Sequence, residues 1–134
     1  MIYLDSGVIL RLVEGAADVR LPIEARLAAF RGSEPFGITS RLSRLECRTK
    51  PLREKQGDLL RLYEAFFASR EIILNEVSRD VIEKATDIRA AYGWKAPDAI
   101  HAATAMLSGA AEFWTADQGF RRCPDLNLIL FAAV

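Results

Sequence analysis

The sequence has few of the residues that disulfide-stabilised proteins and zinc proteins require. Its 134 residues include two cysteines and one histidine. Two cysteines are too few for a disulfide framework, and Cys47 and Cys123 form no CxxC pair and have no histidine at a zinc-site spacing. This scarcity is typical of a protein of the reducing cytoplasm, which is where we expect the chain to reside.

Net charge and long apolar runs are also absent. Eighteen Lys and Arg residues balance eighteen Asp and Glu residues, with a pI near 6.6. The chain therefore lacks the global basic field that announces a nucleic-acid-binding protein, although a local basic surface remains compatible with RNA. No apolar run approaches the length of a membrane span, and residues 1–5 lack the basic start of a signal peptide. We expect no contact with membranes.

Several catalytic and nucleotide-binding motifs are missing as well. The sequence contains no GxGxxG, no Walker loop, no HExxH and no GxSxG. It is 51% hydrophobic and has the length of one ordinary domain. We therefore expect residues 1–134 to form a single domain.

Short β-prone runs alternate with helical patterns along the chain. Predicted strands span residues 2–4, 36–39, 70–74, 112–115 and 126–131; predicted helices span 8–14, 18–31, 40–50, 57–69, 77–92 and 97–107. Pro51 is expected to end the third helix. Alternation of this kind predicts βα units, so the fold class is α/β, a three-layer α/β/α sandwich with a mainly parallel central sheet.

Three aspartates occupy positions where a carboxylate is useful. Asp98 lies in the first turn of a helix that begins at Pro97, where free N–H groups favour an ionised side chain. Asp5 and Asp117 each follow a predicted strand, and ligands of parallel sheets gather at the carboxyl ends of the strands. Taken alone, Asp98 is best explained as a helix cap.

Glu46 has two interpretations. It recurs at helical spacing with Leu42 and Leu45, which predicts an inward-facing carboxylate. The alternative is a surface glutamate paired with Lys50 one turn later, a contact worth only about 0.3 kcal/mol. Spacing alone favours the surface pair.

Several acids at one edge of a sheet repel one another unless a cation lies between them. Oxygen ligands favour hard ions, and Mg²⁺ or Mn²⁺ accept few protein ligands and leave room for water and phosphate oxygens. Such ions activate water for attack on a phosphodiester. The pattern therefore indicates a hydrolytic nuclease.

The chain resembles the PIN-domain ribonucleases, specifically the VapC toxins of bacterial toxin–antitoxin pairs. The resemblance covers nearly the whole chain and rests on four motifs in order: Ile2-Tyr3-Leu4-Asp5-Ser6, Ser40-Arg41-Leu42-Ser43-Arg44-Leu45-Glu46, Ala96-Pro97-Asp98-Ala99-Ile100-His101-Ala102-Ala103-Thr104-Ala105 and Thr115-Ala116-Asp117-Gln118-Gly119-Phe120. Gly7 and Cys47 depart from the usual pattern next to the first and second acids.

The resemblance implies a PIN-like fold and a Mg²⁺- or Mn²⁺-dependent endoribonuclease. Its catalytic and metal-binding residues would be Asp5, Glu46, Asp98 and Asp117, with Ser6 and Thr115 as polar support. The resemblance also overturns the surface reading of Glu46, and it implies an RNA substrate, a cognate antitoxin protein and a homodimer. The alternatives are a catalytically silent PIN-like domain that binds RNA or a partner, and a housekeeping RNA-processing nuclease.

Other candidate residues are set aside or left open. His101 lies among alanines and is interpreted as a hydrogen-bonded histidine of the core or of the site rim. Cys47 is excluded as a nucleophile because no second histidine exists to activate it. The basic segment 41–55, with Arg41, Arg44 and Arg48, is either a solvated helix face or a contact for RNA or an acidic antitoxin segment.

The helix predicted over residues 57–69 has an unusually apolar face. That face contains Leu59, Leu62, Tyr63, Phe66 and Phe67. It is either part of the core or the interface of the expected homodimer.

Overall fold

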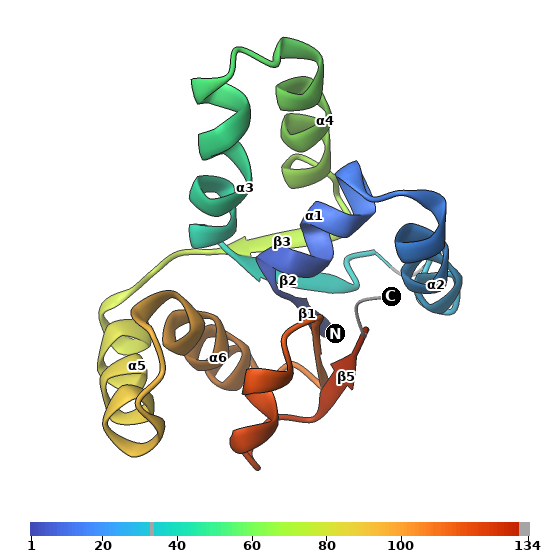
Figure 1. Cartoon of the computed structure of the whole chain (residues 1–134). Helices are drawn as coiled ribbons and strands as arrows, with labels where there is room; N and C mark the ends of the chain where they lie inside the picture. Colours follow the sequence, from blue (N-terminus) through green and yellow to red (C-terminus); the bar gives the residue numbers. More distant parts are fainter. Residues whose placement is uncertain (33, 132–134) are drawn as a thin grey trace.

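A parallel sheet lies at the centre of the computed structural model, which describes residues 1–32 and 34–131. Within these residues the strands are β1 (Ile2–Leu4), β2 (Gly37–Ser40), β3 (Ile72–Asn75), β4 (Glu112–Thr115) and β5 (Leu128–Leu130). They pair in the order β3-β2-β1-β4-β5, and every pairing is parallel. The strand formed first in the sequence is therefore the middle of the sheet (Figure 1).

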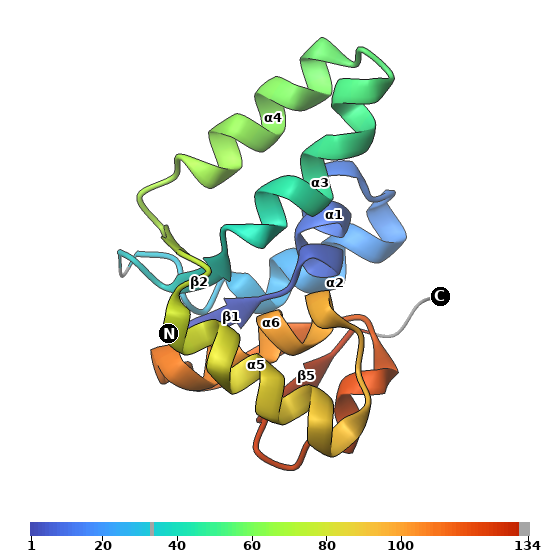
Figure 2. The same ribbon diagram turned by 90° about the vertical axis from the view of Figure 1, so that its left-hand side faces the viewer.

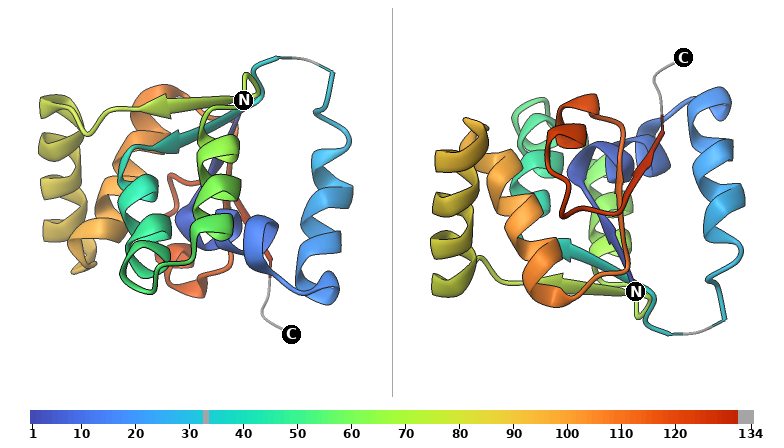
Figure 3. Two further views of the ribbon diagram at one scale, coloured as in Figure 1. Left: turned by 90° about the horizontal axis from the view of Figure 1, so that it is seen from above. Right: turned by 90° about the horizontal axis from the view of Figure 1, so that it is seen from below.

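Helices cover both faces of this sheet. They are α1 (Ser6–Glu14), α2 (Ala17–Leu27), α3 (Leu42–Arg53), α4 (Gly57–Phe67), α5 (Arg79–Tyr92) and α6 (Ala96–Ser108), followed by the short 3-10 helix η1 (Gln118–Arg122). Helices α5 and α6 pack on one face, and α1 to α4 lie on the other, with α3 and α4 side by side (Figures 2 and 3). The predicted three-layer α/β fold is confirmed. None of the described helices combines the length and the apolar character needed to cross a bilayer.

Each face of the sheet has its own core because successive side chains of a strand point to opposite faces. Tyr3 of β1 packs with α5 and α6, whereas Ile2 and Leu4 pack with α1 to α4. In β4 the same alternation places Phe113 in the first core and Trp114 in the second. Strand β1 is buried on both faces and is apolar throughout, so its run shows no polar alternation.

Helix α6 lies close to the sheet because it presents small side chains. Ala99, Ala102 and Ala103 are fully buried. The helix ends at Gly109, whose φ of 70° is a left-handed conformation that glycine adopts without strain. The helix therefore holds its first turn, with Asp98, in a fixed place against the sheet.

Two details of the helices differ from the sequence prediction. Pro51 does not end α3, which continues to Arg53. Proline has no N–H and removes one helical hydrogen bond, but near the last turn this loss is small, and the ring of Pro51 is buried. Helix α2 ends at Leu27 instead of residue 31, and residues 28–32 form turns.

Candidate active site

Asp5 ends the central strand and begins the first helix. One of its carboxylate oxygens accepts a hydrogen bond from the backbone N–H of Val8 (2.9 Å), which caps α1, and the other accepts one from the hydroxyl of Thr115. The side chain is buried. Burial raises the pKa of Asp5 above its ordinary value, the two hydrogen bonds oppose this, and the negative charge of Asp117 adds to the rise.

Asp117 lies just beyond β4, the neighbouring strand. Its carboxylate accepts a hydrogen bond from the N–H of Gly119 (2.8 Å), and its own N–H donates to the hydroxyl of Thr115 (3.0 Å). Asp5 and Asp117 line the same surface hollow, together with Gly7 and Arg11. The predicted meeting of two strand ends at one edge therefore occurs, and Thr115 connects them.

Asp98 lies in the first turn of α6 and is half-buried. Burial and then the negative charge of Asp117 raise its pKa, and Glu46 adds to the effect. Desolvation and the neighbouring acids therefore act against the helix terminus, which favours the charged form of this carboxyl. Asp98 and Asp117 line a second hollow, whose wall includes Trp94 and Phe120.

Glu46 projects from α3 toward α6, not toward Lys50. Its carboxylate accepts a hydrogen bond from Nε2 of His101 (2.6 Å), whereas Lys50 approaches Glu54. The surface pair with Lys50 is therefore wrong. Burial opposes ionisation of Glu46, but the hydrogen bonds from His101 and Ser6 outweigh it, so the pKa of Glu46 lies below its ordinary value.

The prediction that Glu46 lies on an inward face of α3 is only partly correct. Leu45, expected on the same inward face, is 63% exposed. The buried residues of α3 are Ser43, Cys47 and Pro51. Glu46 lies beside that stripe and becomes half-buried because α6 covers it, a contact that spacing on α3 cannot reveal.

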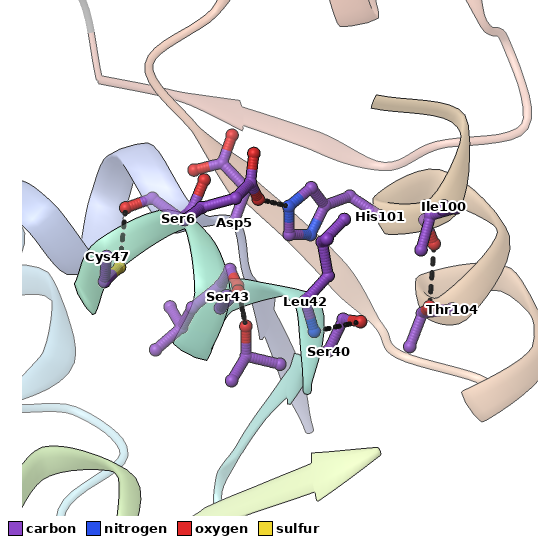
Figure 4. Close-up of polar contacts among 12 residues, drawn as sticks. Asp5, Ser6, Ser40, Leu42, Ser43, Cys47, Ile100, His101 and Thr104 are labelled. Atoms are coloured by element: carbon purple, nitrogen blue, oxygen red, sulfur yellow. Dashed lines mark hydrogen bonds and ion pairs between the residues drawn. The ribbon is translucent and has the colours of Figure 1, made fainter. Parts of the chain in front are cut away.

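His101 is the residue of this region that sequence reasoning undervalued. It is buried, its Nδ1 lies 2.6 Å from the hydroxyl of Tyr3, and its Nε2 lies 2.6 Å from Glu46. Figure 4 shows Asp5 and Ser6 at the start of α1, Cys47 on α3 and His101 on α6 converging on this region. The interpretation of His101 as a hydrogen-bonded histidine is confirmed. Its partners are 98 and 55 residues away in the sequence, so no local signal points to them.

The four acids are electrostatic neighbours, but they do not form a closed metal cage. Asp117 acts on both Asp5 and Asp98, and Glu46 acts on Asp98. Among residues 1–32 and 34–131, no group of three or more His, Cys, Asp or Glu side chains is arranged to hold one metal ion. The donor set still fits Mg²⁺, which is bound through one or two carboxylates and retains several waters. That all four acids share one ion stays a prediction.

Three arginines at the start of α3 and along it are paired within the protein. Arg41 contacts Glu76 (2.7 Å), while Arg44 and Arg48 both contact Glu64 (3.0 and 2.8 Å). These side chains also line a broad surface hollow. The structure thus shows acidic partners for these three arginines, and whether the segment faces solvent, RNA or a protein partner stays open.

The sheet is parallel and carries carboxylates at the ends of the adjacent strands β1 and β4. This arrangement is typical of α/β proteins whose ligands bind at a switch in strand order. Residues 2–126 match the family model of the PIN domain, and the chain belongs to this family. A comparison with curated proteins found no match.

Three solved structures are similar along almost the whole chain. A toxin–antitoxin complex from Klebsiella pneumoniae has 21% identity and a TM-score of 0.74, with all of both chains covered. VapBC2 from Rickettsia felis, bound to a DNA fragment from its promoter, has 16% identity and a TM-score of 0.77, covering 98% of this chain and 99% of that one. VapC20 from Mycobacterium tuberculosis, a Sarcin-Ricin loop cleaving toxin, has 19% identity and a TM-score of 0.74, covering 92% and 95%. At these identities the likeness shows a shared fold.

Proposed function

We propose that this protein is a Mg²⁺- or Mn²⁺-dependent endoribonuclease and the toxin of a type II toxin–antitoxin pair. The observation that carries the proposal is the meeting of three aspartates at the carboxyl edge of the sheet, where Asp117 lines one surface hollow with Asp5 and a second with Asp98. Carboxylates that repel one another at such an edge attract a divalent cation. Membership of the PIN domain family and the likeness to VapC20 support the choice of RNA.

Asp5, Asp98 and Asp117, with Glu46, would hold the metal. A bound Mg²⁺ or Mn²⁺ supplies an activated water and stabilises the leaving oxygen of a phosphodiester. The chain's own groups prepare the ligands: Thr115 orients Asp5, the N–H of Gly119 orients Asp117, and Ser6 supports Glu46. Preorganised ligands of this kind need no rearrangement when substrate arrives.

The proposed partners follow from the solved relatives. Two of them are toxin–antitoxin assemblies, which supports a cognate antitoxin for this chain. Helix α4 supports a homodimer less than expected, because Tyr63 and Phe67 belong to the protein's own core. Among the large apolar side chains of α4, only Leu62 counts as exposed, at 56%. We retain the homodimer and a cytoplasmic location as parts of the proposal.

The test is RNA cleavage by the purified protein with Mg²⁺, with Mn²⁺ and with a chelator. We expect cleavage with either ion and none with chelator or with Asp98→Asn. Binding of RNA without any cleavage would favour the silent PIN-like alternative. A protein that cleaves RNA, does not harm growing cells and is not inhibited by the product of a neighbouring small gene would favour the housekeeping nuclease.

A further inference from the structure

The single imidazole of the sequence is buried between a tyrosine of the central strand and a candidate metal ligand. His101 is 2% exposed, with Tyr3 on one ring nitrogen and Glu46 on the other, each at 2.6 Å. Both contacts are short enough to be strong hydrogen bonds. The row Tyr3, His101, Glu46 therefore connects the sheet to α3 through α6.

We infer the direction of each hydrogen bond in this row by counting hydrogens. The backbone N–H of Ser40 donates to the hydroxyl oxygen of Tyr3 (3.2 Å), so this oxygen is already an acceptor. A phenol retains its hydrogen at neutral pH, and the shortest contact available to the Tyr3 hydroxyl is Nδ1 of His101 at 2.6 Å. Nδ1 is then an acceptor, so the ring hydrogen is on Nε2 and is donated to Glu46.

The row is held rigidly at its sheet end. Tyr3 is fully buried, and its ring stacks on that of Phe113 with centroids 5.1 Å apart and planes 7° from parallel. His101 lies on the buried side of α6 beside Ala102. A side chain locked by packing transmits its orientation to the group that it bonds.

We propose that His101 is a positioning residue: Tyr3 fixes its tautomer, and its Nε2–H orients the carboxylate of Glu46 as a ligand for the divalent cation. The proposal rests on the proposed function, because it assigns Glu46 to the metal site. Groups that hold a metal ligand from behind fix its geometry, and their loss weakens metal binding about 10- to 100-fold.

Replacement of His101 by glutamine or by asparagine distinguishes this role from simple packing, because the two side-chain amides lie at different distances from the backbone. His101→Gln places its amide N–H where Nε2 lies and keeps the donor to Glu46. His101→Asn is one bond shorter and reaches only the Tyr3 side. Binding of Mn²⁺ alone, measured by titration calorimetry, should weaken about 10- to 100-fold in the Asn variant and stay within a few-fold of wild type in the Gln variant. Equal loss in both variants, or loss in neither, overturns the proposal.

The tautomer gives a readout that does not depend on metal. Because the chain has one histidine, both histidine ring ¹⁵N resonances belong to His101. We expect a hydrogen on Nε2 and none on Nδ1; a hydrogen on Nδ1 contradicts the proposal. Tyr3→Phe keeps the ring stacked on Phe113 and removes the hydroxyl. It should shift the Nδ1 resonance and weaken Mn²⁺ binding by less than the Asn variant, and it carries the test if the Asn variant does not fold. Unchanged Mn²⁺ binding in folded Tyr3→Phe would then overturn the role.

Failure of this inference is distinguishable from failure of the proposed function. If wild-type protein binds no Mn²⁺, the metal-dependent function fails and the positioning role fails with it. If wild type binds Mn²⁺ and Asp98→Asn loses it, while folded His101→Asn does not, the role of His101 alone is wrong. Thermal melting of each variant verifies the fold.

Discussion

The hydroxyl of Thr115 donates a hydrogen bond to the carboxylate of Asp5 across the boundary between β4 and β1. The same hydroxyl accepts a hydrogen bond from the N–H of Asp117. The buried side chain of Thr115 thus connects the ends of the adjacent strands β1 and β4. Both aspartates that it contacts are candidate metal ligands. Its removal should be felt at both.

Thr115→Val tests this connection, since valine keeps the shape and loses the hydroxyl. Asp5 then loses a donor and the N–H of Asp117 loses an acceptor, so we expect a loss of about 1–3 kcal/mol in unfolding free energy, with weaker Mn²⁺ binding. Thr104→Val is the matched control because its hydroxyl bonds only to the carbonyl of Ile100 one turn earlier. Urea denaturation of both variants gives the comparison; equal effects would contradict the linking role.

Asp98→Asn should abolish RNA cleavage and leave the fold intact. Losing a ligand outright should lower the cleavage rate about 100-fold or more, since even groups behind a ligand are worth 10- to 100-fold. Asparagine removes a negative charge from beside Asp117 without changing the side chain's size. Excess Mn²⁺ is expected to restore only part of the activity.

The control for Asp98→Asn is Asp87→Asn, the same change on the exposed side of α5. It should cut RNA at the wild-type rate. If Asp98→Asn melts well below wild type, or cleaves as wild type does, then Asp98 is a helix cap and not a ligand.

Stability in the absence of metal should depend on pH through Asp98. Its pKa is raised on folding, by burial and by the charge of Asp117, so the folded state binds more protons than the unfolded state, whose pKa is about 3.9. The slope of the unfolding free energy against pH is then negative. The stability of wild type relative to Asp98→Asn falls as pH rises from 3.9 through the raised pKa, and it is constant at pH values above that pKa. Melting temperatures of the two proteins across this range measure the difference.

Divalent metal should reverse that trend. Because the cation binds ionised carboxylates, Mn²⁺ should stabilise wild type more at neutral pH than near pH 4. The Asp98→Asn variant should show a smaller shift in melting temperature at the same metal concentration. An equal shift in both proteins at neutral pH would place the metal elsewhere.

Tyr63→Lys and Leu62→Lys separate the core from a surface on the same helix. Tyr63 is fully buried and bonds to Glu14, so a lysine there should destabilise the fold by about 3–5 kcal/mol. Leu62 is 56% exposed, and its replacement should leave the melting temperature within a few degrees. Light scattering then reports whether Leu62→Lys turns the proposed dimer into a folded monomer; if both variants melt alike, the burial assigned to Tyr63 is wrong.

Much of the fold could be predicted from the sequence because its signals are local. Short apolar runs that end in turn residues predict the strands, and glycine is typical of a helix end, which Gly93 and Gly109 are in α5 and α6. Asp5 and Asp117 could be placed at strand ends on the same grounds. Pro51 was misleading because a proline near the last turn of a helix removes too little to stop it.

The environment of Glu46 and His101 could not be predicted, because both depend on contacts between distant elements. On α3 alone, Glu46 has Lys50 within reach, and only the packing of α6 offers His101 instead. On α6 alone, His101 has neighbouring alanines and no polar partner. The raised pKa of Asp98 also depends on distant elements, since its causes are burial by the packed fold and then the charge of Asp117.

The central position of β1 has a consequence for the order in which the protein is made. Thr115 lies 110 residues after Asp5, and β1 acquires its β4 neighbour only when that later segment has been synthesised. Contacts this distant in sequence close late in folding, and the chain leaves the ribosome from its first residue onward. A nascent chain that stops before Glu112 lacks both Thr115 and Asp117. Until residue 117 has been synthesised, the candidate site therefore lacks one of its four acids and the threonine that links Asp5 to Asp117.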